Sequence, residues 1–289
     1  MKFTEEVCIF TVAGEQLLGI VARPETSGDC GVLIIVGGPQ YRVGSHRQFL
    51  LLSRRLAAAG HVTMRFDYRG MGDSTGVMRS FEDVCEDVGA AIDAMLLACP
   101  TIKRVVLWGL CDAASVALLY LHASNDARVA GLVLLNPWVR SETSLAQTHI
   151  KHYYGQRLLQ KQFWLKLLRG ELKLLDSMRG LLRSARQARG RTIKAAGEAL
   201  AFQEKMAAGL GHFTGHVLLI LSGQDFTAKE FQEFVAASPP WAGLTTAGNI
   251  YQIMILDADH TFSNQQLRTR VEYETLSLIS RFDKNLPVS

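Results

Sequence analysis

Short strand-like runs that alternate with segments of helical spacing constrain the fold of this chain more than any other feature. The run Val32–Val36 is entirely apolar, which is typical of a strand covered on both faces. Further strands are predicted over 62–66, 104–108, 129–135, 217–221 and 250–256, with a hairpin over 7–12 and 17–22 before them. Helices are predicted over 46–59, over 81–98 and from about 264 to 282. This alternation predicts a mainly parallel sheet flanked by helices, with the ligand site at the carboxyl ends of the strands.

Composition and cysteine usage narrow the class of protein. With 289 residues, of which 48% are hydrophobic, the chain can bury a large core and is too apolar for a disordered protein. The amino terminus carries acids where a signal peptide needs positive charge, and no apolar run reaches the roughly 18 residues that cross a bilayer. The odd cysteine count and the absence of a C-x-x-C pair favour neither a disulfide framework nor a thiolate zinc site. We therefore expect a cytoplasmic protein. The five cysteines are Cys8, Cys30, Cys85, Cys99 and Cys111.

Positive charge is concentrated in one segment. The net charge is +4, but residues 151–194 hold twelve Lys and Arg against two acids, so this segment carries +10 and the remainder −6. No strand is predicted between Pro137 and His216, where the sequence is leucine-rich and helical. We expect residues 138–213 to form a basic helical cap over a core of residues 1–137 and 214–289. Contact of this cap with a membrane or anionic lipid is a second interpretation, and nucleic-acid binding is the least favoured because no nucleic-acid module is present.

The sequence Gly109-Leu110-Cys111-Asp112-Ala113 lies between a predicted strand and a predicted helix. A nucleophile at such a sharp turn has a strained backbone and needs small neighbours, which Gly109 and Ala113 provide. Cys111 would then stand above the sheet at a helix amino terminus, where the helix dipole favours a thiolate. The alternative is an inert, small core residue at an elbow that has lost its activity.

An acid and a histidine follow the later strands in an informative order. Asp225 comes just after the strand 217–221, and His260 follows the strand that ends near Leu256. Nucleophile, acid and histidine at the ends of successive strands is the triad order of the α/β-hydrolases. Asp257 and Asp259 compete for the role of the acid, but their position relative to the strands favours Asp225. His149 and His152 have no neighbouring ligand cluster, so no metal is expected.

Two further segments make the resemblance to the α/β-hydrolase superfamily specific. Residues 66–74, FDYRGMGDS, resemble the D-x-R-G-x-G-x-S loop after the fourth strand, and residues 259–262, DHTF, resemble the histidine loop. The sequence departs from the superfamily pattern at Cys111, which stands in place of Ser, and at Val36-Gly37, which replaces the usual His-Gly. Arg69 and Asp73 are expected to stabilise their own loop. The glycines of residues 70–76 do not have dinucleotide-loop spacing, so no cofactor is expected.

A narrower resemblance concerns three other segments. The chain is similar to the exosortase A system-associated hydrolase 1 family in residues 109–115 (GLCDAAS), 135–142 (LNPWVRSE) and 152–154 (HYY). This resemblance implies a bacterial protein in an exosortase and exopolysaccharide context. It does not define a substrate.

These residues together predict a thioester acyl-enzyme mechanism. His260 would take the proton of Cys111 and Asp225 would orient the imidazole, so that the sulfur attacks a carbonyl group. The oxyanion would be bound by the backbone N–H of Asp112 and by a second N–H, with Gly38 the first choice and Gln40 the second, because Pro39 has no N–H.

The predicted function is hydrolysis of a carboxylic ester or thioester in a small-molecule acyl substrate. Two alternatives stay open at this point. The same acyl-enzyme could pass its acyl group to a sugar or lipid acceptor, or the protein could be a non-catalytic binding scaffold with the α/β-hydrolase fold. The sequence gives no information on the oligomeric state, the acyl group or the leaving group.

Overall fold

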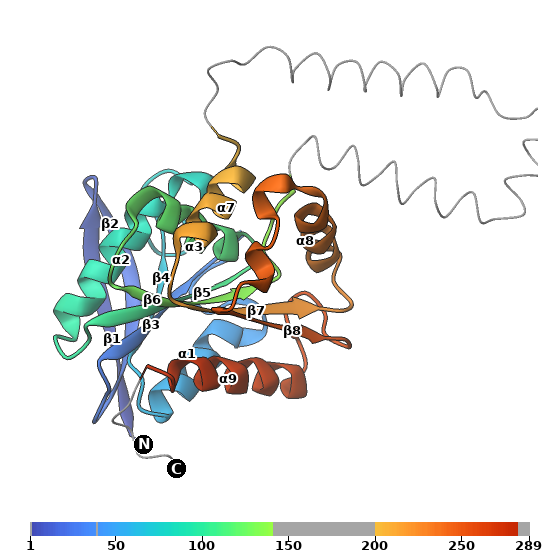
Figure 1. Cartoon of the computed structure of the whole chain (residues 1–289). Helices are drawn as coiled ribbons and strands as arrows, with labels where there is room; N and C mark the ends of the chain where they lie inside the picture. Colours follow the sequence, from blue (N-terminus) through green and yellow to red (C-terminus); the bar gives the residue numbers. More distant parts are fainter. Residues whose placement is uncertain (1, 39, 141–199, 283–289) are drawn as a thin grey trace, which may run out of the picture. The chain divides into compact units, whose positions relative to one another are not determined.

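The computed structural model describes residues 2–38, 40–140 and 200–282, and these residues form an eight-stranded sheet (Figure 1). The strands lie in the order β1-β2-β4-β3-β5-β6-β7-β8. Only β1 and β2, and β2 and β4, pair antiparallel, and every other pair is parallel. The strands are β1 (Phe3–Val12), β2 (Glu15–Pro24), β3 (Cys30–Ile35), β4 (Thr63–Asp67), β5 (Arg104–Leu110), β6 (Val129–Leu135), β7 (His216–Ser222) and β8 (Ile250–Ile255).

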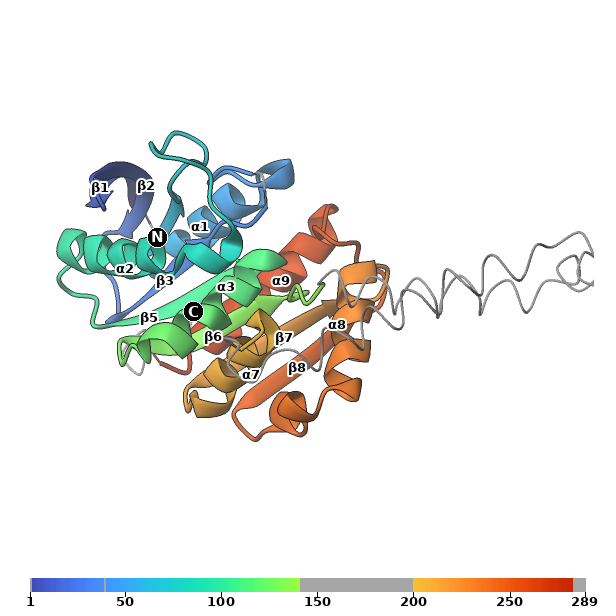
Figure 2. The same cartoon turned by 90° about the horizontal axis from the view of Figure 1, so that it is seen from above.

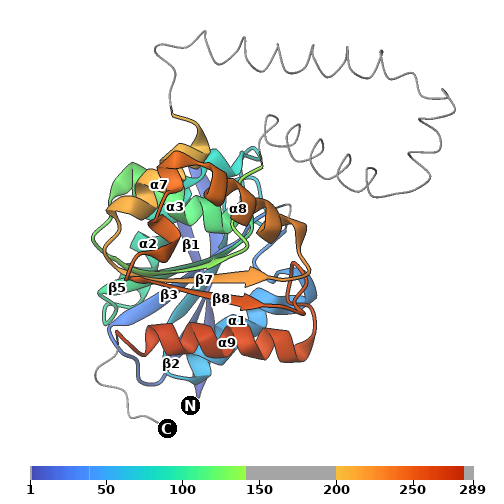
Figure 3. The ribbon, with the colours of Figure 1, turned by 45° about the vertical axis from the view of Figure 1, so that its right-hand side comes forward.

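Helices cover both faces of this sheet (Figures 1 and 3). One face is covered by α1 and α9, and the other by α2, α3, α7 and α8. The longer helices of the described residues are α1 (Gln48–Ala58), α2 (Cys85–Ala98), α3 (Asp112–Ser124), α7 (Phe202–His212), α8 (Phe226–Ala237) and α9 (Gln265–Ile279). This is the α/β-hydrolase fold that the sequence predicts.

The central strands are apolar throughout because both of their faces are buried. In β5, Val106 and Trp108 pack into the core beneath α1 and α9, whereas Val105 and Leu107 pack into the core on the opposite face. All four side chains are at most 2% exposed. A strand in this position has no solvent face on which polar residues could alternate, which explains the continuous apolar runs.

The predicted hairpin is present, and its turn explains its register. β1 and β2 pair from Phe3 opposite Pro24 to Val12 opposite Glu15, which leaves Ala13 and Gly14 as a two-residue loop. Both loop residues have positive φ, 50° and 86°, as type I′ hairpin turns require.

Two helix predictions need correction, and one helix was not predicted. α1 begins at Gln48 rather than His46, because His46 and Arg47 have φ of 52° and 62° and cannot belong to a regular helix. α2 begins at Cys85, since residues 81–83 form a separate 3₁₀ turn. α8 was not predicted, and few of its side chains are buried.

The predicted cap falls mostly on residues 141–199, which lie outside the described residues. At the carboxyl end of the predicted range 138–213, α7 packs on α3 as part of the same compact unit as the sheet. At the amino end, Val139 is buried and its carbonyl accepts a hydrogen bond from Gln203 of α7 at 3.0 Å. The two described ends of this range therefore contact each other.

Candidate active site

The three predicted triad residues follow three strands at one edge of the sheet. Cys111 follows β5, Asp225 follows β7 by three residues, and His260 lies in the loop after β8. Because these strands are parallel, their carboxyl ends lie at the same edge, which Figure 2 shows from above. The fold thus brings together residues that are up to 149 positions apart in the sequence.

Cys111 occupies a strained turn between β5 and α3. Its φ of 62° and ψ of −124° lie where residues with a side chain are rare, and α3 begins at the next residue. The backbone at this turn is held by the Cys111 N–H, which donates to the Leu135 carbonyl at 2.8 Å. The expected requirement for small neighbours is also present. A Cβ atom added to Gly109 would lie 2.5 Å from the backbone carbonyl of Ala113.

His260 and Asp225 form a direct pair. Nδ1 of His260 lies 2.7 Å from Oδ2 of Asp225, whose side chain is 7% exposed. The carboxylate can only accept, so Nδ1 carries the proton and Nε2 remains for Cys111. Asp225 also caps α8, because its carboxylate accepts from the N–H groups of Thr227 at 3.1 Å and Ala228 at 3.3 Å. These three contacts fix the carboxylate beside the histidine.

The hydrogen bond to Asp225 and the interaction with the Cys111 sulfur raise the pKa of His260 to about 10, although burial opposes this rise. His260 is therefore protonated at neutral pH in this arrangement. The positive charge lies between a carboxylate and a sulfur.

The competing acids do not reach the histidine ring. The Asp259 carboxylate accepts from the backbone N–H of Ser263 at 2.9 Å and also bonds to its hydroxyl group. Asp257 is exposed at the end of β8. Of the three candidates, Asp225 is the one that contacts His260.

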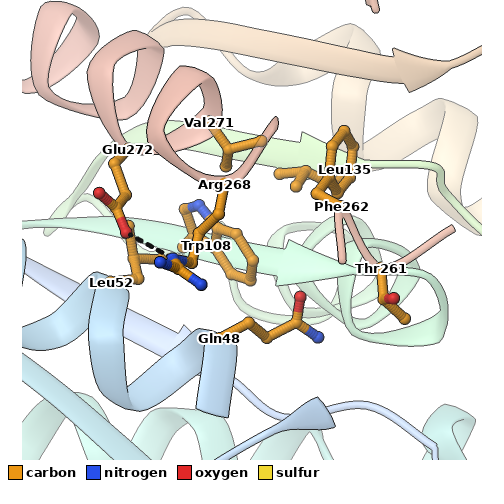
Figure 4. A pocket seen from close by; sticks show the side chains of 9 residues that line it. All are labelled: Gln48, Leu52, Trp108, Leu135, Thr261, Phe262, Arg268, Val271 and Glu272. Carbon is orange, nitrogen blue, oxygen red and sulfur yellow. Dashed lines mark ion pairs between the residues drawn. The ribbon is translucent and has the colours of Figure 1, made fainter. Parts of the chain in front are cut away.

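The loop that carries His260 is anchored on both sides. Asn136, just after β6, is fully buried and donates through Nδ2 to the His260 carbonyl at 3.3 Å. The same amide bonds to Ser222 twice, at 2.8 Å to its hydroxyl and at 2.9 Å from its N–H. Phe262 is 4% exposed and packs beside Leu135 at a small pocket of about 20 Å³ (Figure 4). The pocket lies between α1, α9 and the histidine loop.

Sequence reasoning did not assign this role to Asn136. A signal was present, since an Asn-Pro pair directly follows an apolar strand and asparagine tolerates the left-handed backbone region. Asn136 has a φ of 45°. It connects the ends of β6 and β7 to the histidine loop, so it is a positioning residue for His260.

Both predicted second donors of the oxyanion hole are already engaged in hydrogen bonds. The Gly38 N–H donates to Oδ2 of Asp112 at 2.7 Å, and the Gln40 N–H donates to the Gly38 carbonyl at 2.8 Å. The Gln40 side chain in turn accepts from the N–H of Ser45 at 3.0 Å. The N–H of Asp112, predicted as the other donor, belongs to the first residue of α3.

The loop after β4 is held by its own charged residues. Arg69 is 1% exposed and donates through Nε to Asp87 at 2.6 Å and through Nη2 to Glu86 at 2.8 Å. Asp73 pairs with Arg42 at 2.7 Å, and the backbone N–H of Asp73 donates to Asp67 at 3.1 Å. These contacts stabilise the loop and do not direct the side chains toward Cys111.

Within the described ranges, no group of three or more His, Cys, Asp or Glu side chains is placed to hold a metal ion. No helix in this part of the chain is long and apolar enough to span a membrane. All five cysteines lie in this part of the chain, and none of them forms a disulfide bond.

The chain resembles solved esterases over nearly its whole length. An esterase of Pyrococcus furiosus is 16% identical with a TM-score of 0.63, and the match covers 97% of this chain and 92% of the esterase. A thermophilic esterase of Thermogutta terrifontis is 17% identical with a TM-score of 0.57, covering 98% of this chain and 100% of that protein. Est1E of Butyrivibrio proteoclasticus, solved with ferulic acid, is 14% identical with a TM-score of 0.58 over 94% and 99%.

No curated protein matches the sequence. At these identities the structural matches show the fold alone. The family is shown by the model of a hydrolase family described as serine aminopeptidase, S33, which matches residues 31–234 and so covers more than half of the chain. The chain belongs to this S33 family of α/β-hydrolases.

Proposed function

We propose that this protein hydrolyses a carboxylic ester or thioester through Cys111, His260 and Asp225. One observation carries the proposal: Cys111 lies at a strained strand-to-helix turn beside a histidine whose Nδ1 is 2.7 Å from a buried carboxylate. A nucleophile, a base and a group that orients the base are the parts that acyl transfer requires.

The charge state of His260 favours a thiolate mechanism. Cysteine attacks as the thiolate, and a protonated histidine supplies the neighbouring positive charge. The sulfur forms a bond to the carbonyl carbon, and the carbonyl electron pair moves to oxygen. When the C–O or C–S bond to the leaving group breaks, the leaving group takes the proton from His260. A water molecule, deprotonated by His260, then cleaves the thioester and releases the acid and the Cys111 thiolate.

The family description names a serine enzyme, whereas this chain has Cys111 at the nucleophile position. The backbone geometry of the turn suits either residue, because its demands concern the small neighbours and the positive φ. The two nucleophiles differ in chemistry, since a thiolate reacts without the concerted base assistance that a hydroxyl group needs. We infer that His260 is tuned to cysteine, so Cys111→Ser should retain little activity.

The direct test is to detect the acyl-enzyme. The protein is mixed with p-nitrophenyl butyrate or with butyryl-coenzyme A, and its intact mass is measured within the first turnovers. We expect a butyryl adduct on Cys111 and release of butyrate, with no adduct on Cys111→Ala and no turnover by that variant. Turnover by Cys111→Ala would show that another residue is the nucleophile. Repeating the reaction with glycerol or glucose as acceptor tests acyl transfer, because transfer would give a new ester at the expense of free butyrate.

We also propose the exosortase and exopolysaccharide context as the biological setting. This context rests on the similarity of residues 109–115, 135–142 and 152–154 to the exosortase A system-associated hydrolase 1 family. A cytoplasmic location is part of the same proposal, supported by five cysteines that form no disulfide bond. The basic segment 151–194, for which we propose a cap role, lies outside the described residues.

A further inference from the structure

The carboxylate of Asp112 lies where the oxyanion of a substrate would have to bind. Its Oδ2 accepts the Gly38 N–H at 2.7 Å, and its Oδ1 accepts the Ala113 N–H at 3.0 Å. These two backbone contacts come from the loop after β3 and from the first turn of α3. The N–H groups of Asp112 and Gly38 are the two donors predicted for the oxyanion hole, and the Asp112 side chain engages the Gly38 donor.

An oxyanion hole works because its donors lie about 2.7–3.1 Å from the position that the negatively charged oxygen will take. A carboxylate oxygen bonded at 2.7 Å meets the same requirement. A backbone N–H has a single hydrogen, so it cannot fully bond to the resident carboxylate and to a substrate oxygen together. The resident negative charge would also repel a developing oxyanion.

Building on the hydrolase function proposed above, we propose that the Asp112 side chain is an internal plug of the oxyanion hole. It has to leave the Gly38 N–H before the carbonyl oxygen of a substrate can bind there. Asp112 therefore limits the rate of the reaction that Cys111 performs.

The surroundings of Asp112 are built to accept its carboxylate. A Cβ atom at Gly37 would lie 2.0 Å from Oδ1 of Asp112 and 2.9 Å from the Ala113 nitrogen, so only glycine leaves room. An acid in the first turn of a helix commonly stabilises the helix dipole while it faces solvent. This one instead makes a tertiary contact to a loop 74 residues away.

The charged groups around the carboxylate act in opposite directions. His260 attracts it, and Tyr68, 4% exposed, lies close enough for the Asp112 charge to contribute, after burial, to the raised pKa of the Tyr68 hydroxyl. Burial raises the pKa of Asp112, and its hydrogen bonds from Gly38 and Ala113 oppose this rise. The contacts that hold the ionised carboxylate are thus the contacts that an oxyanion needs.

The test compares Asp112→Ala, which vacates the hole, with Asp112→Asn, which keeps the shape and removes the charge. Asp259→Asn is the matched control, because it removes a carboxylate bonded to a backbone N–H beside His260 without contacting the hole. Losing one oxyanion donor typically slows such reactions about 10²- to 10³-fold. Freeing the Gly38 donor should therefore raise kcat/KM for p-nitrophenyl butyrate at least about 10-fold in Asp112→Ala, with no such rise in Asp259→Asn.

A second readout does not depend on turnover. An alkyl trifluoromethyl ketone such as 1,1,1-trifluorooctan-2-one adds to a cysteine thiolate, forming a C–S bond and placing its oxyanion in the hole. We expect Asp112→Ala to bind it at least about 10-fold more tightly than the wild type, and Cys111→Ala to form no adduct. If Asp112→Ala binds the ketone more tightly but neither the wild type nor any variant hydrolyses an ester or thioester, the plug proposal stands and the proposed hydrolase function is wrong.

Unchanged or weaker ketone binding by both Asp112 variants, or a fall in kcat/KM in both, would overturn the plug. A rise in kcat/KM and in ketone affinity in Asp112→Ala alone would show that the side chain blocks the hole by filling it. A rise in kcat/KM and in ketone affinity in both variants would show that the negative charge of the side chain also contributes to the block. Because Asp112→Asn preserves the side-chain volume and an acceptor oxygen, it reports on the hole even if the alanine variant fails to fold.

Discussion

Replacing Asp225 separates its two roles, because the carboxylate both pairs with His260 and caps α8. Asparagine keeps an oxygen that can accept from the first turn of the helix, whereas alanine keeps nothing. Loss of such a cap costs about 1 kcal/mol. Asp225→Ala should therefore lose the cap and the pair, and Asp225→Asn should lose mainly the pair.

The size of the pairing contribution follows from the pKa of His260. Its rise from 6.5 to about 10 would correspond to about 5 kcal/mol at about 1.4 kcal/mol for each tenfold change. Because 36% of the His260 side chain is exposed, solvent screens the pair, and Cys111 accounts for part of the rise. We assign about 2 kcal/mol of the free energy of unfolding to the pairing with Asp225.

The pH dependence has a definite sign. The folded pKa of His260 exceeds the unfolded value, so its contribution to stability is fully present below pH 6.5 and is lost as the pH rises through about 10. Urea unfolding, followed by tryptophan fluorescence at pH 6 and pH 10 under reducing conditions, measures this. Asp225→Asn should be about 2 kcal/mol less stable than the wild type at pH 6 and nearly equal to it above pH 10. Asp225→Ala, which also loses the cap, should be about 1 kcal/mol less stable than Asp225→Asn at both pH values.

Catalysis gives an independent readout of the same change. Replacing the orienting acid of a serine triad by its amide costs about 10⁴-fold in kcat because the histidine adopts the wrong tautomer. We expect a loss of about 10²- to 10⁴-fold for Asp225→Asn here. Asp257→Asn is the control, since Asp257 is exposed and does not contact the ring. A larger loss in Asp257→Asn than in Asp225→Asn, or an NMR titration that leaves the His260 pKa unchanged in Asp225→Asn, would refute the reasoning.

Three further substitutions test the framework of the site. Gly109→Ala places a Cβ atom 2.5 Å from the backbone carbonyl of Ala113, so it should lower the free energy of unfolding by about 3 kcal/mol in a urea titration. Arg69→Met leaves the buried Asp87 without its partner and should cost about 3–5 kcal/mol by the same assay, whereas a loss below 1 kcal/mol would contradict the ion-pair account. Asn136→Ala removes the anchor of the histidine loop and should lower kcat more than it raises KM, a split that a purely structural role would not produce.

Much of the fold could be predicted from sequence because the strands are buried on both faces. Runs such as Val32–Val36 have no polar position at which another structure could begin, and their order along the chain dictates the crossovers. α8 was missed for the opposite reason: its first residue, Phe226, is 77% exposed, and its buried side chains are few. The start of α1 was predicted two residues too early because His46 and Arg47 adopt positive φ, and no pattern in the sequence predicts this conformation.

The positions of Cys111, Asp225 and His260 could be predicted because each follows a strand, and parallel strands end at one edge. The orientation of side chains could not be predicted in the same way. The contact between Asp112 and Gly38 depends on two loops that are 74 residues apart. Sequence reasoning assigned the N–H of Asp112 to the oxyanion hole and did not predict the contact of its carboxylate. In the structure this carboxylate accepts a hydrogen bond from the Gly38 N–H at 2.7 Å.

A single backbone feature links the nucleophile to this plug. The positive φ of Cys111 turns the chain sharply at this residue. The N–H groups of Asp112 and Ala113 then lie in the first turn of α3, where no helical carbonyl is available to them. Such a helix start binds any anion of suitable size. The Asp112 carboxylate is covalently held beside these donors, so under the plug proposal it occupies the place that a substrate oxyanion would need. The strength of the hydrogen bonds to the Asp112 carboxylate therefore indicates how strongly the same N–H donors would stabilise an oxyanion after the carboxylate has moved away.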